Sequence, residues 1–410
     1  VEEFTVNNQG DLEVGSSLTF SGLDSVVGGG GADTLGVSDF NIVLDTLDAV
    51  DVVTVSGPGL QFQGLSMVTG SGSNMLDALA LGDTFLYITD TAGTVSTVAA
   101  GAPGGIGFSG FGEVQVASLD ASAIGESGLY FRNNTGSILS TVAQDGVTFT
   151  NLSSVTSQVL HSNDNAVDLT LDSVTGWVSS SDVNFEGVTN LFGSGGGALN
   201  GGSNWRLDGD GLGSEIGLDI TLEGTWTVNA ADNATLTDTG VDSVFTLSDG
   251  DVGRVGSGLL FSNLGVVVGG SGARISGGEG WVLDVNGGVR ESTSSILFDS
   301  TWFVVAAGDS LSGTANADVF VMNGDGDVEV GSLTFNGLTS VSGGGSADTL
   351  DASGFAGGVK LENGNDSVST AGILFGEIET VDTASVTGAD SGTAFTLAGG
   401  GVSVNGSALN

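Results

Sequence analysis

The sequence repeats one short pattern: a phenylalanine, an apolar residue three positions later, and Val or Leu three positions after that. Eight clear copies centre on Phe20, Phe62, Phe108, Phe149, Phe185, Phe261, Phe335 and Phe375. Successive copies are separated by 42, 46, 41, 36, 76, 74 and 40 residues, and weaker copies at Leu222 and Phe298 fill the two long intervals. The chain therefore consists of about ten repeats of about 40 residues.

The composition of the repeats indicates short strands joined by tight turns. The chain holds 73 glycines but only two prolines, and Val, Thr, Ser, Asp and Asn are abundant. Alternation such as that of Leu18 and Phe20 favours strands with one buried face. No apolar periodicity of about 3.6 residues indicates a helix, and Gly, Asn and Asp are the residues that form tight turns.

A segment of this kind cannot bury its apolar side alone, so each repeat has to pack against the next. We expect an all-β solenoid of about ten repeats with two coils each. Equivalent residues would lie over one another, and side chains of the Phe20 type would form an aromatic column. The solenoid is expected to run continuously through residues 1–410, with glycine-rich corner insertions near residues 99–107 and 193–211.

The charge balance excludes some classes of partner. Six Lys and Arg stand against 49 Asp and Glu, which gives a net charge of −43. Nucleic acids and anionic membranes are bound through Lys and Arg, so neither is an expected partner. The absence of cysteine excludes disulfides, thiolate catalysis and cysteine-ligated metals. No apolar run reaches the roughly 18 residues of a membrane-spanning helix.

One long stretch occurs twice with little change. Residues 22–40 read GLDSVVGGGGADTLGVSDF, and residues 337–355 read GLTSVSGGGSADTLDASGF. With its glycine-rich corners and Thr-rich strands, the chain resembles the parallel β-solenoid repeats of secreted bacterial surface proteins: filamentous-haemagglutinin-like adhesins, autotransporter passengers and biofilm-matrix fibres. That resemblance implies a right-handed parallel β-helix and a non-enzymatic, extracellular role at the bacterial cell surface, as a fibre, matrix component or adhesin stalk.

Both ends of the sequence fall within a repeat. The opening FTVNNQGDLEVGSSLTF has a close copy at residues 319–335, and the closing AFTLAGGGVSVNGSALN begins the same element again. A solenoid end without a cap exposes unpaired strand edges. Two interpretations stay open: the chain belongs to a longer repeat protein, or protomers stack head to tail into a homopolymer.

Two readings are open for the glycine- and aspartate-rich corners. Residues 28–35 match G-G-x-G-x-D-x-U, the calcium-binding nonapeptide of RTX proteins, and residues 343–350 match it with Ser346 at the third glycine. A third copy carries Arg274 in place of the aspartate, which favours ordinary turns over calcium. No cofactor is required, and calcium is the alternative. The candidate calcium ligands are Asp33, Asp318, Asp325, Asp327 and Asp348.

A carbohydrate-binding or polysaccharide-cleaving β-helix is the other alternative. Cleavage needs acids clustered with a base, whereas the few basic residues, His161 included, are scattered along the chain. We therefore expect no enzyme activity. Binding of a surface or matrix polysaccharide is most plausible at Trp205 and Arg206, since tryptophan can stack on sugar rings. Trp226 and Trp302 occupy matching repeat positions and are expected in the core.

Overall fold

The regular elements of the described chain are all strands, and they form a β-solenoid of about ten turns. This confirms the expected all-β solenoid of parallel stacked coils, whereas two coils per repeat stays a prediction. The computed structural model describes residues 2–15, 17–28, 33–47, 50–71, 74–79, 85–88, 95–98, 107–109, 111–121, 129–131, 138–140, 148–161, 168–180, 183–208, 212–300, 302–362, 367–388, 395–398, 401–404 and 407–409. The handedness of the coil stays a prediction.

The chain divides into two compact bodies, which are described separately. The first body holds residues 1–201 and 218–226, and the second holds residues 202–217 and 227–410. The prediction of one continuous solenoid through all 410 residues therefore stays a prediction.

The strands of the first body are mostly three to six residues long. They are β1 (Glu3–Val6), β2 (Leu12–Val14), β3 (Leu18–Phe20), β4 (Ser25–Val27), β5 (Thr34–Val37), β6 (Ile42–Leu47), β7 (Val50–Val55), β8 (Leu60–Gln63), β9 (Met67–Thr69), β10 (Met75–Asp77), β11 (Phe85–Ile88), β12 (Val95–Val98), β13 (Gly107–Ser109), β14 (Glu113–Gln115), β15 (Ser118–Asp120), β16 (Leu129–Phe131), β17 (Ile138–Ser140), β18 (Thr148–Thr150), β19 (Ser154–Thr156), β20 (Val159–His161), β21 (Asp168–Leu171), β22 (Val178–Ser180), β23 (Val183–Glu186) and β24 (Asn190–Gly201).

Strand β27 (Ile220–Asp238) has residues in both bodies. The other strands of the second body are β25 (Asn204–Leu207), β26 (Gly213–Glu215), β28 (Val244–Ser248), β29 (Asp251–Arg254), β30 (Leu259–Val268), β31 (Ala273–Gly277), β32 (Trp281–Leu283), β33 (Val289–Glu291), β34 (Leu297–Asp299), β35 (Trp302–Val305), β36 (Ser310–Ser312), β37 (Val319–Met322), β38 (Val328–Val330), β39 (Leu333–Asn336), β40 (Ser340–Ser342), β41 (Thr349–Ala352), β42 (Val359–Leu361), β43 (Ser367–Thr370), β44 (Ile373–Gly376), β45 (Thr380–Thr383), β46 (Val386–Thr387), β47 (Phe395–Ala398), β48 (Gly401–Val404) and β49 (Ser407–Leu409).

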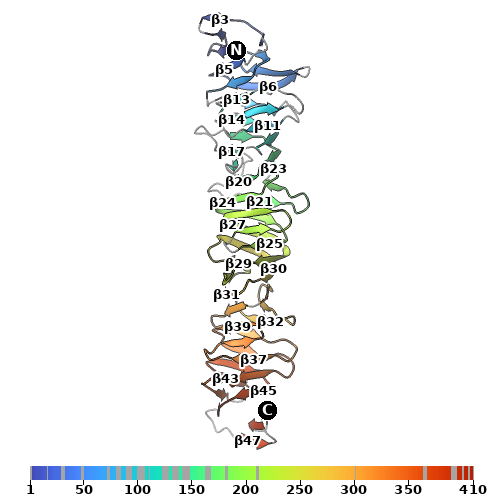
Figure 1. Ribbon diagram of the computed structural model, residues 1–410, viewed down its shortest axis with the longest axis vertical. Helices are drawn as coiled ribbons and strands as arrows, with labels where there is room; N and C mark the ends of the chain where they lie inside the picture. Colours follow the sequence, from blue (N-terminus) through green and yellow to red (C-terminus); the bar gives the residue numbers. More distant parts are fainter. Residues whose placement is uncertain are drawn as a thin grey trace. The chain divides into compact units, whose positions relative to one another are not determined.

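A typical repeat consists of a three-stranded antiparallel meander followed by two single strands. In the repeat β37–β41, strand β38 pairs antiparallel with β37 and with β39. Strand β39 then pairs in parallel with β35 of the preceding repeat, and β41 returns to pair in parallel with β37. The chain thus folds back onto the previous repeat before it advances, and the stacked strands can be followed in Figure 1.

The strands of each body form two rows, and successive meanders alternate between them. In the first body, one row runs β3–β2–β1–β5–β9–β13 and the other runs β4–β8–β7–β6–β10–β14. In the second body, one row contains β35–β39–β38–β37–β41–β45 and the other contains β36–β40–β44–β43–β42–β46. Long strands such as β30 belong to both rows, because one part pairs with β29 and another with β34.

Consecutive repeats join through one recurring pair, a valine opposite a phenylalanine in parallel register. The seven pairs are Val26–Phe62, Val68–Phe108, Val114–Phe149, Val155–Phe185, Val267–Phe298, Val304–Phe335 and Val341–Phe375. All seven phenylalanines are fully buried. We call this arrangement the Val–Phe junction.

The expected aromatic column is wrong, because each phenylalanine of the Val–Phe junction lies opposite a valine of the neighbouring repeat. Phe335 lies opposite Val304 on one side and Val328 of its own meander on the other, so it has no phenylalanine beside it in the sheet. The reason is the meander, which places two further strands between the phenylalanine and the next repeat. The phenylalanines are buried as expected, but they pair with valines and do not stack directly on one another.

The core lies between the two rows of each body. Phe4 and Phe62 belong to different rows, and their ring centroids are 6.1 Å apart. Phe298 and Trp302 likewise meet across the rows of the second body, with centroids 5.5 Å apart and planes at 82°. The Phe298–Trp302 contact is edge-to-face, an arrangement that is favourable for aromatic rings.

The structure describes the two glycine-rich segments that were expected as corner insertions to different extents. Residues 99–106 lie outside the described residues. Within the second segment, residues 193–211, β24 extends to Gly201 and β25 occupies Asn204–Leu207, whereas residues 209–211 lie outside the described residues.

Candidate functional site

The corners that match the nonapeptide are places where backbone from neighbouring repeats packs closely. A Cβ atom on Gly343 would lie 2.1 Å from the backbone oxygen of Glu377 and 2.6 Å from Oδ2 of Asp348. At the matching corner, a Cβ atom on Gly28 would lie 2.8 Å from the backbone oxygen of Gly64. Glycine is therefore required at these positions by close packing, without any ion.

We expect Gly343→Ala to destabilise the second body by about 1–3 kcal/mol, because overpacking forces the backbone to shift. The matched control is Gly345→Ala, since a Cβ atom there would have nothing within 4 Å. Urea denaturation of both variants measures the difference. Equal stability of the two variants would contradict the close-packing explanation.

The corner carboxylates bind backbone N–H groups of the adjacent repeat. The N–H of Asp318 donates to Oδ1 of Asp348 at 2.7 Å, and the N–H of Asp348 donates to Oε2 of Glu379 at 2.7 Å. In the first body, the N–H of Glu2 donates to Oδ1 of Asp33 at 2.9 Å. Each carboxylate thus fixes the register of two successive strands.

Asp325 and Asp327, the other predicted calcium ligands, belong to the turn between β37 and β38. Oδ1 of Asn323 accepts the N–H groups of Asp325 and Asp327, at 3.1 and 3.0 Å. The turn at Asn7 has the same bonds, with Gln9 in place of Asp325. The turn therefore forms without a carboxylate at that position, as an Asx turn.

The predicted calcium ligands do not converge on one point. Asp318 and Asp327 flank β37 at opposite ends, and Asp318 accepts hydrogen bonds from Thr314 instead. Within the described part of the chain, no group of three or more His, Cys, Asp or Glu is arranged to hold a metal ion. Burial raises the pKa of Asp348, and the nearby charges of Asp318, Glu379 and Glu377 raise it further.

We expect the thermal midpoint of unfolding to stay unchanged when calcium is added or chelated, because the corners are closed by hydrogen bonds. Differential scanning calorimetry in calcium and in EDTA measures this, with magnesium as the control for general screening of the negative surface. A rise specific to calcium that Asp348→Asn abolishes would restore the calcium hypothesis.

The predicted glycan site has only one exposed member. Trp205 is fully buried, and its ring packs edge-on against Phe261 with centroids 5.9 Å apart. Its ring is therefore not available to stack on a sugar, whereas Arg206 is exposed. Trp226 and Trp302 are buried as expected, and their Nε1 atoms donate to the backbone oxygens of Glu223 and Asp299.

A buried glutamate faces each of two tryptophans, a feature that the sequence analysis missed. Trp205 pairs with Glu215, and Trp281 pairs with Glu291, in antiparallel register. Both glutamates are buried. The ten-residue spacing from Trp to Glu recurs in the two repeats, and this spacing was the available signal. Glu291 accepts the N–H groups of Glu279, Thr293 and Ser294.

We expect Glu291 to contribute to the loss of stability of the second body in acid. Burial raises its pKa, but hydrogen bonds from the N–H groups of Ser294, Glu279 and Thr293 outweigh burial, so its pKa is below the ordinary value of 4.5. A carboxylate with a lowered pKa stabilises the fold above the ordinary pKa. This stabilisation is lost as the pH falls through the folded-state value.

We expect Glu291→Gln to cost about 1.5–3 kcal/mol at pH 7 and to flatten the loss of stability below pH 4.5. The matched control is Glu215→Gln, because Glu215 accepts one longer bond, 3.4 Å from the N–H of Ser203. Urea denaturation between pH 3 and 7 measures both effects. If the free energy of unfolding of Glu291→Gln falls below pH 4.5 as steeply as that of the unmodified protein, Glu291 does not contribute to the loss of stability in acid.

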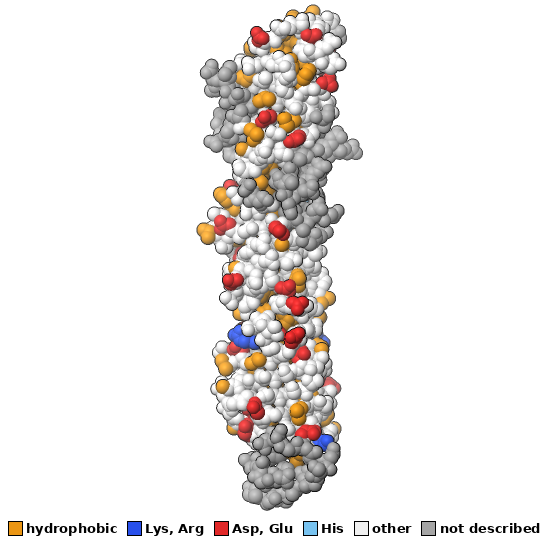
Figure 2. Space-filling model, turned by 180° about the vertical axis from the view of Figure 1, so that it is seen from behind, with side chains coloured by type: hydrophobic (Ala, Val, Ile, Leu, Met, Phe, Trp, Pro, Cys, Tyr) orange, Lys and Arg blue, Asp and Glu red, His pale blue; other side chains and the backbone are white. Residues whose placement is uncertain are grey.

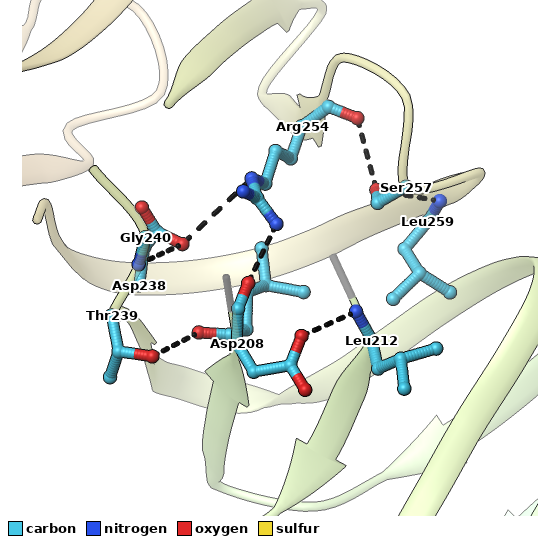
Figure 3. A network of polar contacts seen from close by, with 9 residues as sticks. Asp208, Leu212, Asp238, Thr239, Gly240, Arg254, Ser257 and Leu259 are labelled. Carbon is cyan, nitrogen blue, oxygen red and sulfur yellow. Dashed lines mark hydrogen bonds and ion pairs between the residues drawn. The ribbon is translucent and has the colours of Figure 1, made fainter. Parts of the chain in front are cut away.

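A second feature missed from the sequence is the nearly buried Arg254 (Figure 3). Its Nη1 donates to the backbone oxygen of Asp208 at 2.8 Å, and its Nε lies 3.9 Å from Oδ1 of Asp238. Asp238 Oδ1 also accepts the N–H of Gly240 at 3.2 Å. Arg254 on β29 thereby binds the end of β27 to the turn between β25 and β26, so its role is to join repeats.

An open groove of about 430 Å³ lies on the described surface of the second body. Its polar lining comes mainly from Asp284, Thr314, Asn316 and Asp318. Asp284 is held by Arg290, whose Nε donates to it at 2.9 Å, and Asp318 is held by Thr314. Asp284 and Asp318 are thus each bonded to a neighbouring side chain.

The described surface carries many more acidic than basic side chains. Figure 2 shows Asp and Glu scattered over one face, with Lys and Arg at few places. No helix among the described residues is long and apolar enough to span a membrane. No protein-family model and no curated protein matches this sequence.

Proposed function

We propose that this protein is a non-enzymatic structural scaffold, exported to the bacterial cell surface or extracellular matrix. Its length comes from stacking repeats of one kind, within a chain and between chains that assemble end to end. The Val–Phe junction is the observation that carries this proposal. The same contact occurs seven times, so the fold is built from a unit whose main partner is another copy of itself. Such repeat arrays provide length and surface more readily than a single catalytic pocket.

The polar groups support the same proposal. The carboxylates of Asp33, Asp348 and Glu379 at the corners accept backbone hydrogen bonds, and the nearly buried Arg254 joins repeats. These side chains stabilise the contacts between neighbouring repeats. A high negative charge favours solubility and disfavours nucleic acids and anionic membranes.

Electron microscopy of the purified chain over a range of concentrations tests the proposal. We expect end-to-end particles whose length grows with concentration and with salt, because salt screens the repulsion between chains of charge −43. Uniform single particles at every concentration and salt level would remove the self-assembling form of the proposal. If the protein cleaved a polysaccharide, the proposal that it is not an enzyme would be wrong.

A further inference from the structure

Two strands carry one half of the Val–Phe junction without the other half among the described residues. Phe20 on β3 occupies the phenylalanine position of the junction, but the only strand paired with β3 in the described residues is β2. Val381 on β45 occupies the valine position, and the only strand paired with β45 in the described residues is β41. Within the described residues, Phe20 therefore has no junction valine and Val381 has no junction phenylalanine, and each edge carries the half that the other lacks.

The exposure of side chains in the first repeat supports an uncovered interface. Leu18, Phe20 and Leu23 are 56, 43 and 36% exposed. The same sequence pattern at Leu333, Phe335 and Leu338 is 2, 0 and 5% exposed, because the preceding repeat covers it there. Apolar side chains gather at the N-terminal end of the molecule in Figure 2. The difference in exposure is the surface that one further repeat would bury.

We propose that β3 and β4 of one copy of this chain bind β45 and β46 of a second copy, with Phe20 opposite Val381. This inference rests on the proposed scaffold function and names the surfaces through which it would extend. The interior junctions determine the register: Thr334 pairs with Phe303 as Thr19 would pair with Thr380. The second pair is Val26 opposite Val386, by analogy with Val341 opposite Leu311.

The two edges are compatible in charge and size. Asp382, the one charged residue of β45, would face Ser21 beside β3, so no like charges lie directly opposite. Val386 is 43% exposed and would be covered by Val26. The two edges of one copy differ from each other, so their pairing is heterologous and continues from copy to copy.

The rival occupant of the β45 edge is the chain's own β49. Its pairing with β48 places Leu409 opposite Val402, the register that Phe335 has with Val328. Strands β47, β48 and β49 form a separate three-stranded sheet. The experiment therefore has to distinguish a second copy from β49.

Cysteine cross-linking tests the register, since the chain contains no cysteine. Strands of a sheet lie about 4.8 Å apart, within disulfide reach. Thr19→Cys and Thr380→Cys proteins are mixed at high salt and oxidised. We expect a disulfide-linked heterodimer, reduced about tenfold by adding Phe20→Asp to the first protein. Val174→Asp, at a turn residue that is 91% exposed, is the matched control and should leave the yield unchanged.

Three outcomes would overturn this inference, and they bear differently on the scaffold function. Long particles without the 19–380 disulfide would reject these edges and leave the scaffold function standing. An intramolecular disulfide in the Thr380→Cys, Ala408→Cys double variant would show that β49 fills the edge. If neither long particles nor disulfides form, both this inference and the self-assembling scaffold are rejected.

Discussion

Replacing Phe335 by alanine is expected to lower the free energy of unfolding of the second body by about 3–5 kcal/mol. The ring is fully buried between Val304 of the preceding repeat and Val328 of its own meander. Removing it leaves a cavity at the contact that joins two repeats. In a repeat protein, stability depends on such contacts between neighbours, so the loss should appear as weakened cooperativity as well.

The matched control is Phe20→Ala, which changes the same residue in the same Leu-Thr-Phe context. Phe20 is 43% exposed and has no preceding repeat among the described residues, so we expect a cost below about 1.5 kcal/mol. Urea denaturation followed by circular dichroism measures both variants. Similar losses for the two substitutions would contradict the importance of the junction.

Arg254→Met is the second substitution with a large expected effect, about 3–5 kcal/mol. The arginine side chain is 11% exposed and that of Asp238 is fully buried, so removing the guanidinium leaves a buried carboxylate without its cation. The backbone oxygen of Asp208 also loses its donor. Denaturation of the second body, followed by the fluorescence of its tryptophans, measures the loss.

Arg206→Met is the control for charge alone, because Arg206 is exposed and should change stability by less than about 0.5 kcal/mol. The double variant Arg254→Met, Asp238→Leu should recover part of the loss, since replacing a buried ion pair by apolar side chains removes the cost of desolvation. If Arg254→Met were as mild as Arg206→Met, Arg254 would not be the residue that joins these repeats.

The repeat and its strands could be predicted from the sequence, whereas the pairing could not. The pattern from Phe335 to Val341 gives the third strand of a meander and the strand after it. Their partners lie about 30 residues away, and local alternation of apolar residues does not specify them. The sequence analysis therefore placed phenylalanine on phenylalanine, where the fold places valine.

The sequence contains a pattern that would have predicted the first turn of these meanders. Asn323 and Gly326, like Asn7 and Gly10, are spaced for a tight turn between two alternating segments, and both glycines have positive φ, +89° and +84°. This spacing is typical of a hairpin rather than a calcium loop.

The candidate sites were predictable only as residue types. Nothing local to Trp205 indicates that its ring is covered by Phe261, because that contact depends on how two rows of strands face each other. The corner aspartates could be recognised in the sequence. Their hydrogen bonds to the next repeat depend on the register between repeats.

The most direct test of the account is the register of the Val–Phe junction, measured with two cysteine pairs that share Thr334→Cys. Phe303 lies opposite Thr334, whereas Leu374 lies opposite Ser340. We predict that Phe303→Cys with Thr334→Cys forms an intramolecular disulfide in the folded protein, and that Thr334→Cys with Leu374→Cys does not. A disulfide between positions 334 and 374, with none between 303 and 334, would mean that the phenylalanines stack directly, and it would contradict the fold described above.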